Sequence, residues 1–298
     1  MANDAQVSAP GGVMITGASS GIGMECALYL DRRGYRVFAG VRKASDGEAL
    51  TKAASPRLSP VIVDVTDAES IFGAARQVAQ ALRAVPLVGL VNNAGIGVGG
   101  PVEFLAPAEL RRQMEVNLIG PLAVIQAFMP MLRSSRGRIV NISSIGGIVA
   151  TPFLSAYCAS KFALEALSDC LRSELKPWGI EVSIVEPGAI KTRIFEKARN
   201  TVDEVLRALP PDGVRYYGGE IDVMRNLIAM QDRSAVPAER VAKVVEHALS
   251  AKRPRARYLV GVDAKLMAFL HWTLSARSFD GLFAMFKRRV GGGPAAGG

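Results

Sequence analysis

Two residues of a predicted helix, Tyr157 and Lys161, could together move a proton. They are four positions apart, so on a helix their side chains share one face. A free tyrosine has a pKa of about 10 and is a poor base near neutral pH, but a nearby ammonium favours tyrosinate and lowers that pKa. Such a phenol can exchange a proton with an alcohol or carbonyl oxygen. Taken alone, the same spacing is typical of an ordinary surface pair.

Two serines, Ser143 and Ser144, follow a predicted strand at residues 138–142. A hydroxyl at the end of a strand can donate a hydrogen bond to a substrate oxygen on which negative charge develops. It can equally cap the next turn. The residue types alone do not choose between Ser143 and Ser144.

A glycine-rich loop joins the first predicted strand, residues 13–16, to a helix over residues 22–33. Its glycines have the spacing G-x-x-x-G-x-G, which allows a tight turn and a close backbone approach to a pyrophosphate. The N-terminus of the following helix offers free N–H groups to phosphate. We therefore predict a dinucleotide site whose candidate residues are Gly17, Ser19, Ser20, Gly21, Ile22 and Gly23.

Arg42 follows the second predicted strand, where such sites contact the adenosine ribose. An acid at this point binds the 2′-hydroxyl of NAD, whereas a guanidinium suits the 2′-phosphate of NADP. The chain has Arg42 and Lys43 here and no acid until Asp46, so NADP(H) is favoured and NAD(H) is the alternative cofactor. An exposed surface arginine is the other interpretation of Arg42.

Short apolar segments alternate with helix-period segments along most of the chain. The predicted strands are residues 13–16, 36–41, 61–63, 87–91, 138–142, 181–185 and 257–260, and the predicted helices are 22–33, 68–84, 107–132, 156–176 and 236–250. This alternation predicts an α/β fold with a doubly wound parallel sheet. The glycine-rich loop, Arg42, Ser143 and Ser144 would then follow the carboxyl ends of its strands.

We expect one main domain with additions at its C-terminal end. Residues 1–10 are predicted to be a flexible N-terminus, 11–262 the catalytic domain, 263–290 an apolar and basic helical extension, and 291–298 a flexible tail. Within the domain, residues 193–235 interrupt the alternation and are predicted to form a substrate lid. Turn signals at 210–213 and 216–219 predict mobile excursions there.

Several motifs occur together in the order typical of the short-chain dehydrogenase/reductase family, which the chain resembles over residues 11–195. The residues that match are the loop at 16–23; Asp64 and Val65; Asn92, Asn93, Ala94 and Gly95; Asn117; Ser144, Tyr157 and Lys161; and Pro187, Gly188 and Thr192. The resemblance implies a Rossmann-type sheet of seven strands in the order 3-2-1-4-5-6-7. It also selects Ser144 over Ser143, because the family has a fixed spacing from serine to tyrosine.

The resemblance further implies a role for each matched residue. Asn117, Ser144, Tyr157 and Lys161 would be catalytic, with Ser144 and Tyr157 contacting the substrate and Lys161 also holding the nicotinamide ribose. Asn117 would complete a proton relay, although a buried asparagine bonded to backbone is the alternative. The cofactor contacts implied outside the glycine-rich loop and Arg42 are Asp64, Val65, Asn93, Ala94, Gly95, Tyr157, Lys161, Pro187, Gly188, Ile190 and Thr192. Family members are often homodimers or homotetramers.

The reaction expected on this basis is hydride transfer between a nicotinamide cofactor and a secondary alcohol/ketone pair. Residues 145–155 carry no charge and favour a lipophilic substrate. They resemble, more loosely, enzymes of steroids and retinoids such as 17β-hydroxysteroid dehydrogenases. The alternative from another class is a non-catalytic dinucleotide-binding sensor or scaffold on the same fold.

Composition and charge exclude several other classes. The 298 residues include three cysteines and two histidines, so neither a disulfide framework nor a structural metal site is expected. The polar first ten residues predict no secretory signal, and we expect a cytoplasmic protein. Nine Lys and Arg against two Asp in residues 251–290 supply +7 of the net charge of +9. These basic residues do not alternate with aromatic residues that could stack on bases, so we expect no nucleic-acid partner. Residues 264–290 could instead contact a membrane surface peripherally.

Overall fold

The computed structural model describes residues 10–291 and contains one main sheet of seven parallel strands. The order is β3-β2-β1-β4-β5-β6-β9, which confirms both the expected number of strands and the expected order. The strands are β1 (Gly12–Ile15), β2 (Arg36–Val41), β3 (Leu58–Ile62), β4 (Leu87–Asn92), β5 (Arg138–Ile142), β6 (Glu181–Pro187) and β9 (Arg257–Val260). Every one overlaps a segment that the apolar pattern predicted.

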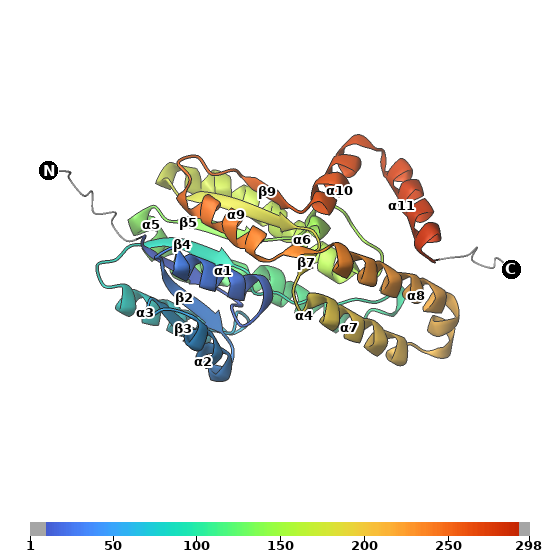
Figure 1. Ribbon diagram of the computed structural model, residues 1–298, viewed down its shortest axis with the longest axis horizontal. Helices are drawn as coiled ribbons and strands as arrows, with labels where there is room; N and C mark the ends of the chain where they lie inside the picture. Colours follow the sequence, from blue (N-terminus) through green and yellow to red (C-terminus); the bar gives the residue numbers. More distant parts are fainter. Residues whose placement is uncertain (1–9, 292–298) are drawn as a thin grey trace.

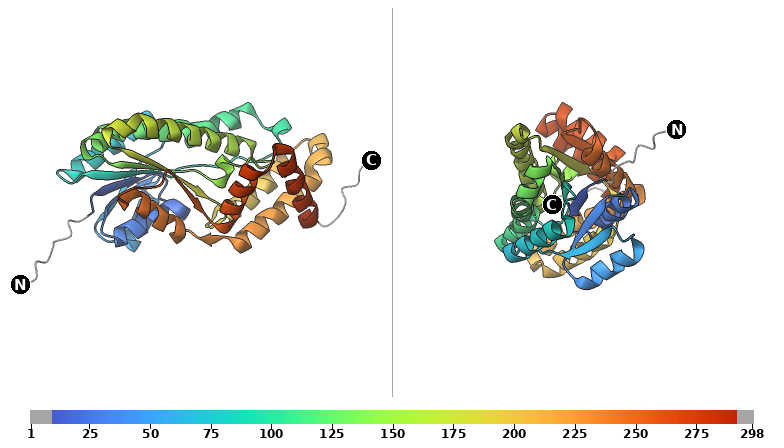
Figure 2. Two further views of the ribbon diagram at one scale, coloured as in Figure 1. Left: turned by 90° about the horizontal axis from the view of Figure 1, so that it is seen from above. Right: turned by 90° about the vertical axis from the view of Figure 1, so that its left-hand side faces the viewer.

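Helices cover both faces of the sheet (Figures 1 and 2). One face packs against α1 (Gly21–Arg32), α2 (Ala44–Ala53) and α9 (Glu239–Ser250). The other packs against α3 (Ala68–Leu82), α5 (Gly120–Ser135) and α6 (Ser155–Leu175), while α4 (Pro107–Met114) precedes α5. Because each face is covered, the strands carry nearly continuous apolar residues, as in other parallel sheets.

The helix α2 was not predicted. It buries only Gly47 and Leu50, so its sequence has little of the apolar periodicity that marks a helix. Gly47 lets this helix approach the edge strand closely, since a Cβ there would lie 2.7 Å from the Cβ of Pro60.

Pro107–Ser135 is long and apolar enough, by length and composition alone, to cross a membrane. Its buried side chains, among them Val124, Phe128 and Leu132, pack on the sheet as part of the core. A π-helical turn, η2 (Glu115–Ile119), separates α4 from α5. We therefore interpret this segment as a core helix.

Residues 193–235 form an antiparallel helical hairpin of α7 (Ile194–Ala208) and α8 (Pro211–Ser234), packed side by side (Figure 1). The turn predicted at 210–213 lies where α8 begins, with Pro211 in its first turn. The turn predicted at 216–219 is wrong, because those residues are inside α8. That helix buries Ile221, Met224 and Leu227, and this packing outweighs the unfavourable helix propensity of the two glycines.

The predicted extension forms two more helices, α10 (Val262–Thr273) and α11 (Ala276–Gly291). α10 contacts β9 and the short turn η3 (Ile145–Gly147), and α11 contacts α8. A two-stranded sheet of β7 (Ile190–Lys191) and β8 (Val236–Pro237) brackets the α7–α8 hairpin, so the predicted helix 236–250 begins later, at Glu239. Flexible ends are expected at residues 1–10 and 291–298. Of these, residues 1–9 and 292–298 lie outside the described residues, and only Pro10 and Gly291 are described.

Candidate active site

The predicted site residues lie along the edge of the sheet formed by the carboxyl ends of its strands. Since the strands are parallel and in register, with Ile15 beside both Ala39 and Val91, the loops that follow them open on the same edge. These residues are Gly17, Ser19, Ser20, Gly21, Ile22 and Gly23 after β1; Arg42 after β2; Asp64 and Val65 after β3; Asn93, Ala94 and Gly95 after β4; Ser144 after β5; and Pro187, Gly188, Ile190 and Thr192 at and after β6. Tyr157 and Lys161 come from α6 and Asn117 from η2.

The glycine-rich loop is bonded to the loop after β4. The hydroxyl of Thr16 accepts hydrogen bonds from the backbone N–H groups of Asn93 (3.0 Å) and Ala94 (3.1 Å). In return, the Asn93 amide donates to the carbonyl oxygens of Thr16 and Gly17, each at 3.0 Å. The two loops therefore form one rigid unit, and Asn93 acts in it as a structural clamp.

This unit has the shape that a dinucleotide needs. Gly17 has φ +67°, and a Cβ there would lie 2.7 Å from the Cα of Ala94. A Cβ on Gly23 would lie 2.3 Å from the carbonyl oxygen of Gly17. Only glycine fits either position. The first turn of α1 has no acidic residue and no side-chain cap, so its N–H groups could bind a phosphate group. The residues present thus fit the pyrophosphate of a nicotinamide dinucleotide.

The adenosine end of the predicted site contains Arg42 and Asp64. Hydrogen bonds from the Thr66 backbone N–H (2.9 Å) and hydroxyl (2.7 Å) hold the pKa of Asp64 below its usual value, and the charge of Arg42 lowers it further. The Arg42 side chain is exposed. Val65 is buried, and its carbonyl oxygen would lie 2.8 Å from a Cβ on Gly120. The backbone of Val65 therefore faces the start of α5.

Asn117 is buried and bonded to backbone, as the alternative interpretation expects. Its carbonyl oxygen accepts from Ile96 N–H (2.9 Å), and its amide donates to the Ile96 carbonyl (3.0 Å) and to the hydroxyl of Ser160 (3.1 Å). Ser160 in turn donates to the carbonyl oxygen of Tyr157 at 2.7 Å. These bonds connect the loop after β4 to the helix that carries the tyrosine.

A second amide, Gln113, holds the same loop and was missed by sequence reasoning. It lies one helical turn before Asn117, accepts from Val98 N–H at 2.7 Å and donates to the Ile96 carbonyl at 2.8 Å. Gln113 lies four residues before Asn117, so the two amide side chains share one helix face, and this spacing could have indicated a role for Gln113. Next to this loop, a Cβ on Gly97 would lie 3.9 Å from a ring carbon of Tyr157, so the loop forms a wall beside the phenol.

The phenol of Tyr157 lies beside Ser144. A Cβ on Gly146 would lie 3.1 Å from Cε1 of Tyr157 and 3.5 Å from Oγ of Ser144, so both side chains face this turn. The Ser144 hydroxyl also caps the turn by accepting from Gly146 N–H at 3.0 Å. Both the capping and the substrate-facing interpretations of Ser144 therefore fit its position.

The expected lowering of the Tyr157 pKa is wrong for this structure. Burial raises the pKa of Tyr157, while the neighbouring Ser144 hydroxyl opposes that rise. Lys161 does not reverse it, because its ammonium lies 5.9 Å from the centroid of the phenol ring and donates instead to the Ile142 carbonyl at 2.8 Å. The phenol is therefore protonated at neutral pH and suited to donate a proton.

Lys161 is buried at the end of β5. Burial lowers its pKa to about 8, and the carboxylate of Glu165, one turn further along α6, opposes that decrease. Lys161 therefore carries its positive charge at neutral pH and loses it as the pH rises through about 8.

The loop after β6 is attached to the C-terminal extension. The backbone N–H of Gly188 donates to Val260 at 2.9 Å, and that of Ala189 donates to the Asp263 carboxylate at 2.6 Å. A Cβ on Gly188 would lie 2.2 Å from the same carboxylate. Ile190 is buried in the core, and a Cβ on Gly21 would lie 3.5 Å from the Cβ of Thr192, so Thr192 lies beside the glycine-rich loop. Sequence reasoning missed Asp263, which has no local signal because its partner is 74 residues away.

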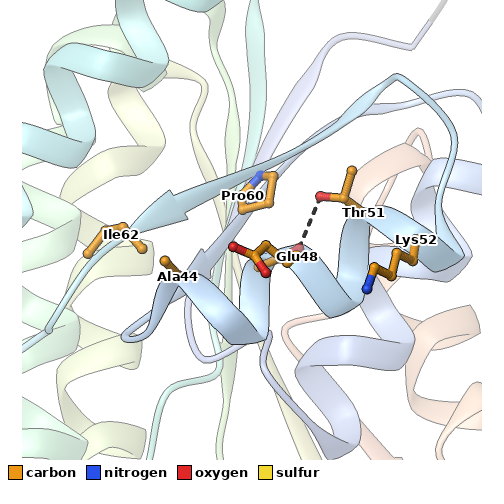
Figure 3. A pocket seen from close by; sticks show the side chains of 7 residues that line it. Ala44, Glu48, Thr51, Lys52, Pro60 and Ile62 are labelled. Carbon is orange, nitrogen blue, oxygen red and sulfur yellow. Dashed lines mark hydrogen bonds between the residues drawn. The ribbon is translucent and has the colours of Figure 1, made fainter.

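Two other features of the described residues lie apart from this constellation. A shallow hollow of 680 Å³ between α2 and β3 is lined by none of the predicted site residues (Figure 3). Within residues 10–291, no three His, Cys, Asp or Glu side chains are grouped as a metal site would require, and Cys26, Cys158 and Cys170 are free thiols.

Comparison with known proteins gives consistent matches. A family model described as short chain dehydrogenase matches residues 12–203. Retinol dehydrogenase 5 of Homo sapiens is 41% identical over 263 residues, covering 86% of this chain and 82% of that protein. A short-chain dehydrogenase from Streptomyces avermitilis has a TM-score of 0.75 at 28% identity, covering 97% of this chain and all of the other. One from Burkholderia cenocepacia, in complex with NADP, has a TM-score of 0.69 at 29% identity, covering 93% and 97%.

The buried ammonium predicts a pH-dependent stability. Because the pKa of Lys161 is about 8 when folded and about 10.4 in an unfolded chain, the unfolded state binds more protons between these values. The free energy of unfolding contributed by this group should therefore rise, by on the order of 1 to 2 kcal/mol, between pH 7.5 and 9.5. Urea denaturation should show a flatter pH dependence for Lys161→Met, whereas the exposed Lys176→Met should match the wild type. Equal slopes for the wild type and Lys161→Met would contradict the assignment.

Proposed function

Because the chain belongs to the short-chain dehydrogenase/reductase family of oxidoreductases, we propose that it transfers hydride between a nicotinamide dinucleotide and a lipophilic alcohol/carbonyl pair, with Tyr157 as the acid/base. The observation that carries the proposal is the convergence of Ser144, Tyr157, Lys161 and Asn117 beside the glycine-rich loop. A non-catalytic sensor has no need to bring these four residues together.

The residues of the chain would act on the substrate oxygen. When bound, the reduced nicotinamide supplies the hydride that adds to the carbonyl carbon. The Ser144 hydroxyl donates a hydrogen bond to the carbonyl oxygen, and the Tyr157 phenol gives that oxygen its proton. The positive charge of Lys161 stabilises the tyrosinate that remains. Asn117 holds the loop that contains Ile96 in place. We propose that Asn117 also connects Lys161 to solvent in a proton relay.

Different parts of the cofactor would bind to different loops along the edge of the sheet. The loop containing Gly17 and Gly23 would hold the pyrophosphate, and Arg42 would bind the 2′-phosphate of NADP(H), which we propose as the preferred cofactor over NAD(H). Asp64 would lie at the adenine. The remaining proposed contacts are Ser19, Ser20, Gly21, Ile22, Val65, Asn93, Ala94, Gly95, Tyr157, Lys161, Pro187, Gly188, Ile190 and Thr192.

A lipophilic substrate is supported by the walls around the site. The α7–α8 hairpin packs over the loop after β4, where Tyr217 meets Phe104 and Phe153 edge to face at 6.0 and 6.1 Å between ring centroids. The Tyr217 hydroxyl donates to the Glu103 carboxylate at 2.9 Å, while the three aromatic rings would favour an apolar ligand. The relatives named retinol dehydrogenases support a retinoid-like or steroid-like molecule as the substrate class.

We also propose that the protein is cytoplasmic and contacts membranes peripherally through residues 264–290. Large apolar side chains recur on one face of α10 and are exposed, including Phe269 (59%) and Trp272 (85%). Basic residues flank them on α10 and α11, as interfacial helices require. The homodimer or homotetramer implied by the family stays a prediction.

The assignment of Tyr157 is tested by Tyr157→Phe. Loss of the phenolic proton should lower NADPH-dependent carbonyl reduction by at least about a hundredfold. NADPH binding, followed by fluorescence titration, should be nearly unchanged. A panel of steroid, retinoid and aliphatic carbonyl compounds supplies the assay, read as NADPH or NADH absorbance loss. Full turnover in Tyr157→Phe would exclude the mechanism, and no turnover of any compound by the wild type would favour the sensor.

Cofactor preference is tested by Arg42→Ala. Removal of the guanidinium should raise the KM for NADPH by roughly tenfold or more, since a charge-assisted contact with phosphate contributes about 1.5–3 kcal/mol. The KM for NADH should change little. The matched control is Arg57→Ala, an exposed arginine after α2 that is not among the cofactor candidates. Equal effects of Arg42→Ala on both cofactors would contradict the 2′-phosphate role.

Membrane contact is tested by co-sedimentation with vesicles of phosphatidylglycerol and phosphatidylcholine. Replacing both Phe269 and Trp272 by serine should reduce binding by at least about tenfold, because two large apolar side chains no longer enter the interface. Phe72→Ser is the control, since Phe72 is an equally exposed phenylalanine (58%) on α3. If the double variant sediments like the wild type, α10 is not the contact.

A further inference from the structure

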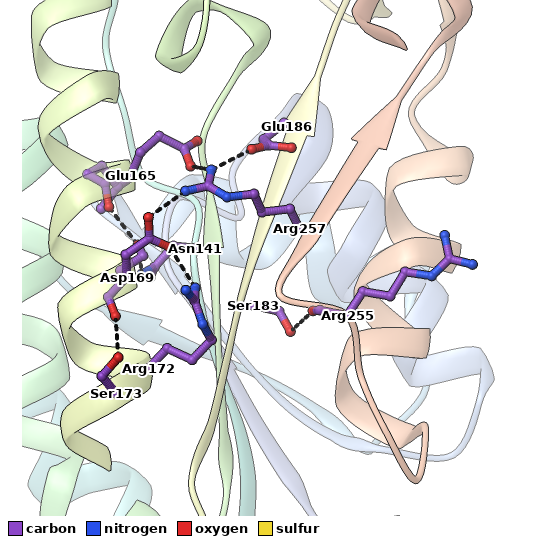
Figure 4. Close-up of polar contacts among 11 residues, drawn as sticks. Asn141, Glu165, Asp169, Arg172, Ser173, Ser183, Glu186, Arg255 and Arg257 are labelled. Carbon is purple, nitrogen blue, oxygen red and sulfur yellow. Dashed lines mark hydrogen bonds and ion pairs between the residues drawn. The ribbon is translucent and has the colours of Figure 1, made fainter. Parts of the chain in front are cut away.

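A buried carboxylate, Glu165, lies on α6 (Figure 4). It follows Lys161 by one helical turn. The two side chains share one face of the helix. Neither the proton relay nor the cofactor contacts described above use Glu165, and the sequence pattern gives it no role.

Glu165 belongs to a network centred on one arginine of β9. Arg257 donates to Glu165 and, at 2.8 Å, to Glu186 of β6. Its other terminal nitrogen donates to Asp169 at 2.7 Å, and Arg172 donates to that same carboxylate at 2.6 Å. Glu165 and Glu186 are buried, while Arg257 is 38% exposed on its side chain. The network thus leads from the buried Glu165 to the surface.

One oxygen of Glu165 faces the turn behind Ser144. Within residues 10–291, Oε1 of Glu165 and Oγ of Ser143 are both buried side-chain atoms without a hydrogen-bond partner. Both lie beside Gly147, where a Cβ would be 3.1 Å from the carboxylate oxygen and 2.7 Å from the serine hydroxyl. Glycine at this position leaves them room, and the hydroxyl of Ser143 can donate to Glu165 after a small rotation.

The groups that face Glu165 make its charge adjustable. Burial raises its pKa to about 7; Ser143 and Arg257 lower it, and Glu186 raises it. On its own helix, Lys161 and Asp169 are the nearest charged groups. With a pKa of about 7, Glu165 is partly ionised at neutral pH and more so above it. Its ionised form can compensate the buried ammonium of Lys161, whose charge burial disfavours.

We propose that Glu165 is a positioning residue that keeps Lys161 protonated, with Arg257 and Ser143 holding Glu165 in its ionised form. This inference rests on the proposed function, because a charged Lys161 matters to turnover only if it stabilises the tyrosinate of Tyr157. A purely structural network, which would only join α6 to β6 and β9, is the competing explanation. In that case Glu165 and Glu186, both bonded to Arg257, should be equivalent.

The experiment is the pH dependence of kcat/KM for carbonyl reduction with NADPH between pH 6 and 9.5. Activity should fall at alkaline pH as Lys161 loses its proton. In Glu165→Gln the alkaline limb should move about one unit toward lower pH, since an opposite charge nearby shifts a pKa by one unit or more. Glu165→Asp keeps a carboxylate, so its alkaline limb should lie close to that of the wild type. Glu186→Gln should leave the alkaline limb in place, even if that variant is no more stable than Glu165→Gln.

A milder variant and a second measurement cover the case in which Glu165→Gln does not fold. Ser143→Ala removes a donor that lowers the pKa of Glu165, so it should shift the limb in the same direction by a smaller amount. In the cofactor-free protein, the rise in unfolding free energy that Lys161 contributes should begin at lower pH in both variants. An active wild type with an unmoved limb in both variants would overturn the proposal. If the wild type reduces no carbonyl compound while the stability profiles of the two variants shift as expected, the proposed function is refuted and the link between Glu165 and Lys161 is not.

Discussion

The ammonium of Lys161 is a charge inside the protein, and most of the site can be understood from what keeps it there. A buried cation is stable only when oxygen atoms replace the water it has lost. The carbonyl of Ile142 provides one such oxygen at the end of β5, and Glu165 provides a compensating charge one turn along α6. Even so, burial lowers its pKa to about 8. The site therefore holds a cation close to the pH at which it loses its proton.

The parallel sheet explains why these groups meet. Strand ends that are far apart in sequence open on one edge, so the loops after β1 and β4 can bond to each other through Thr16 and Asn93. A single long helix, α6, then brings Tyr157, Ser160 and Lys161 to that edge. The π-helical turn at Glu115–Ile119 interrupts the helix packed beside it, and Asn117 within that turn reaches both the loop and Ser160.

The C-terminal part connects the site with the surface. Asp263, in the first turn of α10, holds the backbone of Ala189 in the loop after β6. The helix α10 also carries the exposed apolar side chains that we propose for membrane contact, so this helix is attached to the loop that we propose for the nicotinamide. The α7–α8 hairpin encloses the other side with aromatic contacts to Phe104 and Phe153.

The sequence by itself determined the seven strands, their order through the family resemblance, and the positions of the glycine-rich loop, Ser144, Tyr157 and Lys161. Apart from the strand order, these features depend on local patterns: apolar runs, glycine spacing, and four-residue spacing on a helix. Only the tertiary structure decided the contacts of Gln113, Glu165 and Asp263, whose partners come from distant strands and loops. It also decided the direction of the Tyr157 pKa shift, because burial of a side chain depends on what the rest of the chain packs against it. The helix across Tyr216–Gly219 formed against its local turn signal for the same reason, since the apolar contacts of α8 outweigh local propensity.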